Sequence, residues 1–329
     1  MKIPYQKYHF IIQAEDRLTL PEYKGSTFRG GFGNAFRRVV CALKKKECTE
    51  CLLKTKCIYA YIFETQPPTL PPEKEATTYN KGGFDSMYKY LRIPHPFIIE
   101  PPMAPQRVYE AGEELSFKLI LIGKAVEYLP YFIFTFDELG KIGIGKGRGK
   151  YVLKKVEAGQ ITIYSSEDKI ILPSVPANIL IPEELSFDLK ETNSDDMITL
   201  NFLTPARIIH QRKLTSDLEF HILITSLLRR IAQLSWFHCE GQLPSWDYKH
   251  IIHEAAAIAI FRNSLRWWDW ERYSARQDRR MKMGGVIGEV TYRGNIKIFL
   301  PILKAGEIFH AGKGTSFGLG KYEMKQGKA

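Results

Sequence analysis

A chain of 329 residues in which 44% are hydrophobic and 12% aromatic can bury one large core or two ordinary ones, which excludes a disordered protein. No apolar run approaches the about 18 residues of a membrane helix, and the N-terminus lacks the pattern of a cleaved signal, so we expect a cytoplasmic protein with no membrane partner. The net charge of +11 fits a polyanionic partner or a generally basic surface, and charge alone does not separate the two.

Strand-like and helix-like segments alternate in the first half of the chain. In order, we expect a strand at 5–14, a glycine-rich loop at 21–33, a helix at 34–43, an exposed proline-rich loop around 67–72, strands at 97–100 and 115–122, a helix at 125–139 and a β-hairpin at 151–164.

The second half repeats this order after a polar stretch at 165–195. We expect a strand at 197–203, a long helix at 215–238, partly helical structure at 248–272 and strands at 286–292 and 296–300. Because a glycine-rich loop follows near the end of each half, we predict an internal duplication with a domain boundary near residue 190.

Two glycine-rich loops with interleaved cations lie at corresponding places, 140–151 and 310–323. Glycine lets the backbone approach a ligand and leaves its N–H groups open, and Lys and Arg add the charge that phosphates attract. Neither loop directly follows a first strand and opens a helix, so no nucleotide cofactor is expected. We predict that the loops bind a phosphate backbone, with a plain flexible turn as the alternative. The predicted contacts are Gly145, Lys146, Gly147, Arg148, Lys150, Gly312, Lys313, Gly314, Gly318 and Gly320.

The segment 262–282 interleaves arginines with aromatic residues, including Trp267, Trp268 and Trp270. Cations suit phosphates and flat rings suit unstacked bases, a combination typical of proteins that bind single-stranded RNA. The alternative is that the tryptophans belong to the core and the arginines to a solvated helix face. The predicted RNA contacts here are Arg272, Arg276, Arg279 and Arg280.

Four cysteines with the spacing C-x6-C-x2-C-x5-C follow the first predicted helix. They are Cys41, Cys48, Cys51 and Cys57. Zinc held by four thiolates is the leading candidate, and an iron–sulfur cluster or four reduced thiols without metal are the alternatives. Four cysteine ligands leave no open position for catalysis, so such a site would be structural.

Several motifs in a fixed order resemble those of CRISPR-associated RAMP endoribonucleases, which process repeat RNA. G-S-T-F-R-G-G-F-G-N-A-F-R-R at 25–38, the four cysteines and Y-x-x-I-F-E at 59–64 are similar to the N-terminal half of that family. L-T-P-A-R-I at 203–208, G-G-V-I-G-E-V-T-Y at 284–292 and H-A-G-K-G-T-S-F-G-L-G-K-Y at 310–322 are similar to its C-terminal half. The resemblance spans nearly the whole chain, and the terminal motif is its most specific part.

The resemblance implies an α+β fold of two tandem ferredoxin-like (RRM-like) domains, at 1–190 and 191–329, with a cysteine-rich insertion at 41–57. It also implies maturation of CRISPR RNA, in which a 2′-hydroxyl attacks the adjacent phosphate without a metal and leaves a 2′,3′-cyclic phosphate. The implied partners are repeat RNA, the mature crRNA and other CRISPR effector proteins, and no cofactor is implied for catalysis.

This reaction needs a general base and a general acid, and histidine suits both roles because its pKa lies near neutrality. Many relatives place a histidine in or near the first helix, whereas this chain has none between His9 and His95. His310, at the mouth of the second glycine-rich loop, is therefore the first candidate.

Further candidates lie in the loop before the first predicted helix and at the end of the long one. Tyr23 and Lys24 stand near the first helix, and His238 closes the long helix of the second half, so these three complete the set of catalytic candidates. Arg29 and Arg37, in the N-terminal segment, are candidate RNA contacts.

Two other functions stay open. One is a RAMP protein that holds guide RNA within an effector complex without cutting it, which the absence of a first-helix histidine favours. The other is a metal-stabilised structural protein whose basic face is incidental.

Overall fold

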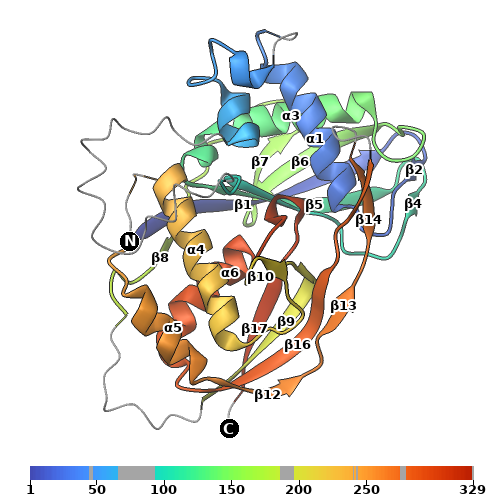
Figure 1. Ribbon diagram of the computed structural model, residues 1–329. Helices are drawn as coiled ribbons and strands as arrows, with labels where there is room; N and C mark the ends of the chain where they lie inside the picture. The colour runs from blue at the N-terminus through green and yellow to red at the C-terminus, as the bar shows by residue number, and fades with distance from the viewer. Residues whose placement is uncertain are drawn as a thin grey trace. The chain divides into compact units, whose positions relative to one another are not determined.

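The computed structural model describes two compact units (Figure 1). The described residues are 1–43, 47–65, 93–185, 196–239, 241, 244–274 and 279–327. Within them, the N-terminal unit comprises 4–65 and 93–178, and the C-terminal unit comprises 1–3 and 179–327. The boundary expected at residue 190 lies outside the described residues, and the two units divide between Asn178 and Ile179. None of the described helices combines the length and apolar character that a bilayer crossing requires.

The N-terminal unit follows a β-α-β-β-α-β order. Its main elements are β1 (Lys2–Ala14), α1 (Gly25–Val40), β3 (Phe97–Glu100), β5 (Glu114–Ile122), α3 (Leu129–Ile142) and β6 (Tyr151–Ala158). The strands form an antiparallel sheet in the order β3-β5-β1-β6, as in a ferredoxin-like fold. Additional elements are β2 (Leu18–Thr19), β4 (Val108–Tyr109), β7 (Ile161–Ser165), β8 (Ala177–Leu180), η1 (Cys48–Glu50), η2 (Ala60–Glu64) and η3 (Gly123–Tyr128).

Phenylalanines at helical spacing build the core of this unit. Phe28, Phe32 and Phe36 fall at four-residue intervals along α1, so all three lie on one face of the helix and are buried. The ring of Phe32 lies 4.9 Å from that of Phe132 on α3 and 5.1 Å from that of Phe136. The two helices therefore pack together through aromatic contacts above the sheet.

The C-terminal unit repeats the same order. Its main elements are β9 (Asp196–Ala206), α4 (Phe220–His238), β12 (Ala259–Asn263), β16 (Gly285–Gly294), α6 (Leu300–Phe309) and β17 (Tyr322–Gly327). Its antiparallel sheet has the order β12-β16-β9-β17, which matches the other sheet strand for strand, and α4 and α6 lie side by side in Figure 1. Additional elements are β10 (Ile209–His210), β11 (Lys213–Leu214), α5 (Tyr248–Ala256), β13 (Arg266–Trp268), β14 (Glu271–Ser274), β15 (Arg279–Lys282), η5 (Lys297–Phe299) and η6 (Thr315–Phe317).

A glycine–tyrosine contact recurs at the same place in both units. A Cβ on Gly140 of α3 would lie 2.2 Å from the carbonyl oxygen of Tyr151, and the Tyr151 hydroxyl donates to a main-chain carbonyl of α3 at 2.8 Å. A Cβ on Gly306 of α6 would lie 2.2 Å from the hydroxyl of Tyr322, which donates to a main-chain carbonyl of α6 at 2.5 Å. The same two residue types thus hold β6 and β17 to the helices that precede them, which supports the predicted duplication.

The predicted loop at 21–33 is wrong, because α1 begins at Gly25 and its glycines lie inside the helix. A Cβ on Gly31 would lie 3.2 Å from a side chain of α3, and one on Gly33 would lie 2.1 Å from the ring of Phe63. These glycines let α1 approach its neighbours closely, and this packing outweighs their low helix propensity.

Two predictions for the second half are also corrected. The segment 296–300, predicted to be a strand, is helical: η5 leads into α6, and Pro301 occupies the first turn, where its missing N–H is tolerated. Within 248–272 only α5 is helical, and much of the remainder forms β12 and β13. A short apolar run does not distinguish a strand from a buried helical turn, which explains the first error.

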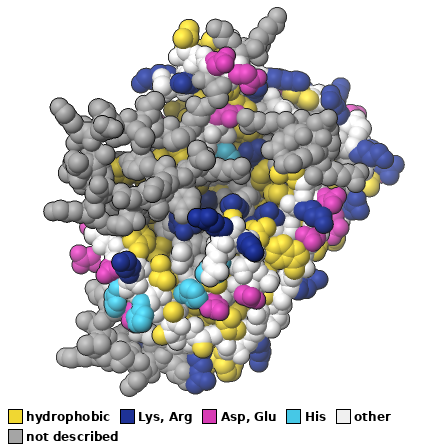
Figure 2. All heavy atoms as spheres, in the orientation of Figure 1, with side chains coloured by type: hydrophobic (Ala, Val, Ile, Leu, Met, Phe, Trp, Pro, Cys, Tyr) yellow, Lys and Arg dark blue, Asp and Glu magenta, His cyan; other side chains and the backbone are white. Residues whose placement is uncertain are grey.

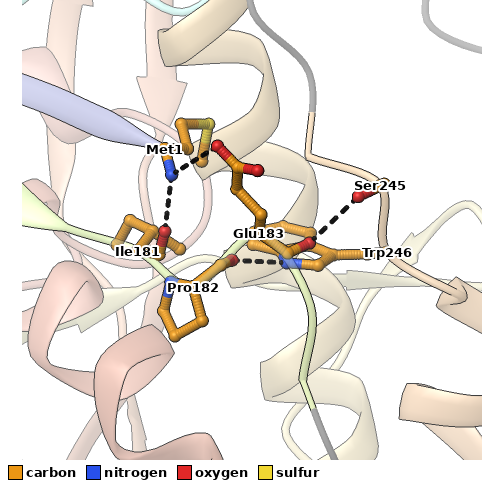
Figure 3. A network of polar contacts seen from close by, with 6 residues as sticks. All are labelled: Met1, Ile181, Pro182, Glu183, Ser245 and Trp246. Carbon is orange, nitrogen blue, oxygen red and sulfur yellow. Dashed lines mark hydrogen bonds and ion pairs between the residues drawn. The ribbon is translucent and has the colours of Figure 1, made fainter.

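Main-chain contacts attach the segment after β8 to the C-terminal unit (Figure 3). The amino group of Met1 donates to the carbonyl of Ile181 at 2.8 Å, and the Trp246 indole donates to that of Pro182 at 3.0 Å. The carboxylate of Glu183 lies 3.6 Å from the same amino group. These contacts place 181–183 with the C-terminal unit.

The glycine–tyrosine contact can be tested by Gly140→Ala. We expect this variant to lose about 1–3 kcal/mol of unfolding free energy, because the methyl group would overlap the Tyr151 backbone. Gly30→Ala is the matched control, since Gly30 also lies inside a helix but a Cβ added there would have no atom within 4 Å. The control should gain about 0.5–1 kcal/mol from helix propensity. Equal unfolding free energies in urea denaturation would contradict the contact.

Candidate functional site

The first glycine-rich loop connects α3 to β6 and is fastened to β2. The N–H of Lys146 donates to the carbonyl of Thr19 at 2.9 Å, and a Cβ on Gly145 would lie 2.3 Å from the same oxygen. Gly145 and Gly147 have φ of 73° and 85°, which favour glycine. Beyond this bond the tip of the loop, Lys146 to Arg148, is exposed.

The second glycine-rich loop connects α6 to β17 and uses the same main-chain bond. The N–H of Lys313 donates to the carbonyl of Arg207 at 2.9 Å, and a Cβ on Gly312 would lie 2.5 Å from that oxygen. Arg207 follows β9 in the chain, as Thr19 follows β1. Each loop therefore makes an equivalent backbone bond to the segment after the first strand of its unit.

Cations gather at the tip of the first loop. Lys146, Arg148 and Lys150 are exposed, and the side chain of Arg17, on the segment that leads into β2, is 66% exposed. Arg17 forms an ion pair with Glu110 at 3.3 Å, and the three loop cations are all predicted RNA contacts. This part of the N-terminal unit can present positive charge and main-chain N–H groups to a phosphate backbone.

The second loop exposes much less of itself. Lys313 is exposed between the half-buried Gly312 and Gly314, whereas Gly318 and Gly320 are buried. Of the predicted contacts in this loop, Gly312, Lys313 and Gly314 can reach a ligand. Gly318 and Gly320 are packed inside the protein instead.

The second loop lies beside the start of β16 and the end of β13. The Arg207 guanidinium donates to the carbonyl of Gly284, and burial lowers the pKa of Arg207 while Asp269 opposes the shift. A Cβ on Gly284 would lie 1.9 Å from the Asp269 carboxylate and 2.7 Å from Nε1 of Trp267. Because the Trp267 side chain is 41% exposed, the structure brings an exposed indole and the cationic loop tip at Lys313 into one region.

The rest of the basic and aromatic segment forms the ribbon β14–β15. Arg272, Arg279 and Arg280 lie on these strands, and Arg276 lies outside the described residues. The described part of 262–282 contains no helix, so Arg272, Arg279 and Arg280 do not line a helix face. Their contact with RNA stays a prediction.

Tyr23 and Lys24 precede α1 and are both buried. The Lys24 ammonium donates to the carbonyl of Ala104 at 2.8 Å, and burial and then Arg107 lower the pKa of Lys24. Burial and then Glu100 raise the pKa of Tyr23 well above its ordinary value, so Tyr23 is neutral. Both side chains therefore lie inside the N-terminal unit and are not exposed to a substrate.

His310 ends α6 and is fully buried. Its φ of 62° and ψ of 163° belong to a region essentially reserved for glycine, and at the equivalent place α3 ends in Gly143 with φ of 85° and ψ of 155°. Its Nδ1 lies 3.1 Å from the carbonyl oxygen of Leu319, inside the loop. The preceding carbonyl, of Phe309, accepts from Arg230 at 2.7 Å, and burial lowers the pKa of Arg230 to about 9.

All four predicted catalytic side chains are therefore buried, since His238 at the end of α4 is buried too. His95 is only half-buried, and no sequence motif marks it. Arg29 of α1 donates from Nη2 to Nε2 of His95 at 3.2 Å. On the other side of the ring, Oγ1 of Thr65 lies 3.4 Å from Nδ1 and donates to the carbonyl of Ile93 at 3.3 Å.

Aromatic rings pack against both Arg29 and His95. The guanidinium of Arg29 lies 4.1 Å above the centre of the Phe63 ring, and the His95 ring stacks on Phe97 at 5.6 Å. His95 stands between Pro94 and a second proline, which restrict the backbone before β3. These two prolines are the only sequence signal we find for a fixed histidine at this place.

The predicted metal ligands are free thiols, all half-buried. They are Cys41, Cys48, Cys51 and Cys57. Burial and then Glu64 raise the pKa of Cys48, whereas Arg37, whose guanidinium lies 5.9 Å from the centre of the Tyr59 ring, opposes the shift. Over the part of the chain with described positions, no three His, Cys, Asp or Glu side chains form a group that could hold a metal ion. A four-thiolate zinc site would need these thiols to close around the ion, and zinc stays a prediction.

Positive charge is not confined to the loops. Figure 2 shows Lys and Arg side chains over much of the face in view, with Asp and Glu side chains among them. The distribution of the 47 cations and 36 anions of the chain therefore does not identify a binding site. The geometry of the loops is the stronger evidence for its position.

Comparison with known proteins agrees with this arrangement. Residues 3–176, more than half of the chain, match the model of the AF_1859_N family, an N-terminal domain, and residues 200–322 match that of the CRISPR-associated endoribonuclease Cas6. An uncharacterized protein of Archaeoglobus fulgidus is 24% identical over 320 residues, which cover 93% of either chain.

Solved structures confirm the predicted α+β fold. A product complex of a Cas6 protein from Thermus thermophilus matches with a TM-score of 0.52 and 16% identity, over 98% of this chain and 100% of that one. A chain of a partial Cas6-RT-Cas1–Cas2 complex matches with a TM-score of 0.52 and 12% identity, over 99% of this chain and 46% of that one. The chain thus belongs to the family defined by the AF_1859_N domain, and its residues 200–322 match the model of the CRISPR-associated endoribonuclease Cas6.

Proposed function

We propose that this protein binds CRISPR repeat RNA and cleaves it to release guide RNA. The observation that carries the proposal is the equivalent construction of the two glycine-rich loops, each bonded through its backbone so that a cationic tip stays open. The match of residues 200–322 to the Cas6 endoribonuclease model supports RNA processing as the function of the two loops.

The proposed reaction needs no metal and no cofactor. A base takes the proton of a 2′-hydroxyl, the 2′-oxygen attacks the adjacent phosphorus, and the bond from phosphorus to the 5′-oxygen breaks. An acid protonates the departing 5′-oxygen, so the products are a 2′,3′-cyclic phosphate and a free 5′-hydroxyl. Arginine or lysine beside the phosphate stabilises the extra negative charge that develops on its oxygens.

We assign the phosphate backbone to the first loop and an unpaired base to the second. Lys146, Arg148 and Lys150 supply three exposed cations, which suit consecutive phosphates. Beside the second loop, the exposed Trp267 offers a flat face on which a base can stack, and Lys313 supplies a cation.

A second candidate function is a RAMP protein that holds guide RNA within an effector complex without cutting it. The burial of Tyr23, Lys24, His238 and His310 favours this function, because none of these side chains is placed to receive a proton from RNA. The same loops would bind RNA in either case, and other CRISPR proteins would then be the partners. A chain of similar fold occurs in the Cas6-RT-Cas1–Cas2 complex, which supports other CRISPR proteins as partners.

Incubation of the full chain with 5′-labelled repeat RNA in EDTA separates the two functions. We expect cleavage at one position, with a product that carries a 2′,3′-cyclic phosphate, because the mechanism uses the RNA's own 2′-hydroxyl. RNA with a single 2′-deoxy nucleotide at that position should bind equally well and stay intact. Tight binding of unmodified RNA without any product would instead support the non-cleaving protein.

Salt dependence tests the role of the first loop. Replacing Lys146 and Arg148 by alanine should reduce the slope of log affinity against log salt by about 0.7 for each single-strand phosphate contact that is lost. Lys124 on η3 is also exposed and lies outside the loop, so Lys124→Ala is the matched control. Filter binding at several salt concentrations measures the slopes, and an unchanged slope in the double variant would remove the loop from the interface.

A third measurement asks whether His310 acts in structure or in chemistry. We expect His310→Ala to lower the free energy of unfolding by about 1–3 kcal/mol, because the bond with Leu319 is lost, and to leave cleavage nearly unchanged. His310→Gly removes the same bond but relieves the backbone, so it should be more stable than the alanine variant by about 1 kcal/mol or more. A hundredfold loss of cleavage in a fully folded variant would return His310 to the active site.

A further inference from the structure

The hydrogen bonds around His95 define which of its ring nitrogens carries the proton. A guanidinium has donors only, so the Arg29 group at 3.2 Å requires Nε2 of His95 to accept. The hydroxyl proton of Thr65 is directed to the carbonyl of Ile93 at 3.3 Å, so Oγ1 has a lone pair for the proton on Nδ1, 3.4 Å away. These two contacts fit a His95 imidazole that carries a proton on Nδ1 and turns the lone pair of Nε2 toward Arg29.

This is the arrangement of a histidine base with its orienting group. In such sites the hydrogen bond to one ring nitrogen fixes the tautomer, and the other nitrogen is left to take a proton. Here Thr65 is the orienting group, and stacking on Phe97 at 5.6 Å fixes the plane of the ring. His95 is half-buried, whereas His238 and His310 are buried, so His95 is the most exposed of the three histidines.

Arg29 occupies the basic nitrogen in the RNA-free protein. Its guanidinium rests on the Phe63 ring at 4.1 Å, a position from which it can turn its donors to another acceptor without leaving the ring. A phosphate is a stronger acceptor for guanidinium than a neutral imidazole, because its oxygens are charged. Arrival of RNA would thus move the hydrogen bonds of Arg29 to the phosphate and free Nε2.

We propose that His95 is the general base of the cleavage reaction and that Arg29 is the cation that holds the scissile phosphate. This proposal rests on the proposed endoribonuclease function. In the step, Nε2 of His95 takes the proton of the 2′-hydroxyl while the 2′-oxygen bonds to phosphorus, and the bond from phosphorus to the 5′-oxygen breaks. The 5′-oxygen takes a proton from water or from an acid on the protein, and Arg29 donates to the non-bridging oxygens throughout.

The site replaces the first-helix histidine that the family resemblance led us to expect. Arg29 comes from α1, whereas His95 lies 66 residues further along the chain and is brought to the same helix by the start of β3. The helix thus contributes the phosphate-binding group, and the segment just before the strand that packs beside it contributes the base.

Single-turnover cleavage of 5′-labelled repeat RNA by the full chain tests the proposal with His95→Gln. We expect the rate to fall by about a hundredfold or more, the usual effect of losing a general base. Affinity for the RNA with a 2′-deoxy nucleotide at the cleavage site, and the melting temperature, should stay close to those of the wild type. His9→Gln is the matched control, since His9 is also partly exposed in the N-terminal unit but pairs with Glu157 at 3.2 Å instead.

A chemical rescue separates a base from a residue that only supports the fold. His95→Ala should recover part of its rate in added imidazole, which can enter the vacated place, and His9→Ala should not respond. Wild-type cleavage together with a rate for His95→Gln within threefold of it would overturn the role of His95 and leave the proposed function standing. A wild type that binds the RNA but does not cut it would overturn both, and a His95→Ala variant that is folded, inactive and not rescued would make His95 a structural residue.

Discussion

One backbone hydrogen bond in each unit constrains the conformation of the glycine-rich loop and the residues that the loop can contain. Lys146 donates to Thr19 and Lys313 donates to Arg207, both at 2.9 Å, and these bonds draw the loops against the segment after the first strand. At 145 and 312 any residue other than glycine would place a Cβ within 2.3 or 2.5 Å of the accepting oxygen. Those glycines are therefore required by the fold itself. Only the open N–H groups and cations at the tips are left to recognise a ligand.

Regular periodicity made part of this fold predictable. The first strand, the hairpin at 151–164 and the long helix of the second half were found from sequence because their apolar positions repeat over many residues. The predictions failed where packing overrides local preference. Gly33 lies inside α1, where a Cβ would overlap the Phe63 ring, and 297–299 forms a helical turn that buries Phe299.

The candidate site was harder to predict than the fold, for a physical reason. The sequence places glycines and cations together in the loops, so the correspondence between the loops could be recognised from the order of residues alone. Burial could not be recognised in this way, and it removes His310 from the surface. His95 and Arg29 lie 66 residues apart, and only the packing of β3 beside α1 brings the imidazole and the guanidinium to 3.2 Å.

The two units differ in their glycine-rich loops, and the differences fit separate roles in binding RNA. At the end of the helix before the loop, the N-terminal unit keeps Gly143, whereas the C-terminal unit has His310 in the same glycine-type conformation. A residue in this region costs about 1–3 kcal/mol unless its surroundings hold it, and here a buried loop carbonyl does so. The second loop is consequently fixed and mostly buried, with one exposed cation near an exposed indole, which suits a single stacked base. The first loop stays open with three cations, and the same unit carries the histidine–arginine pair, so the proposed contacts to the RNA backbone and the proposed general base both belong to the N-terminal unit.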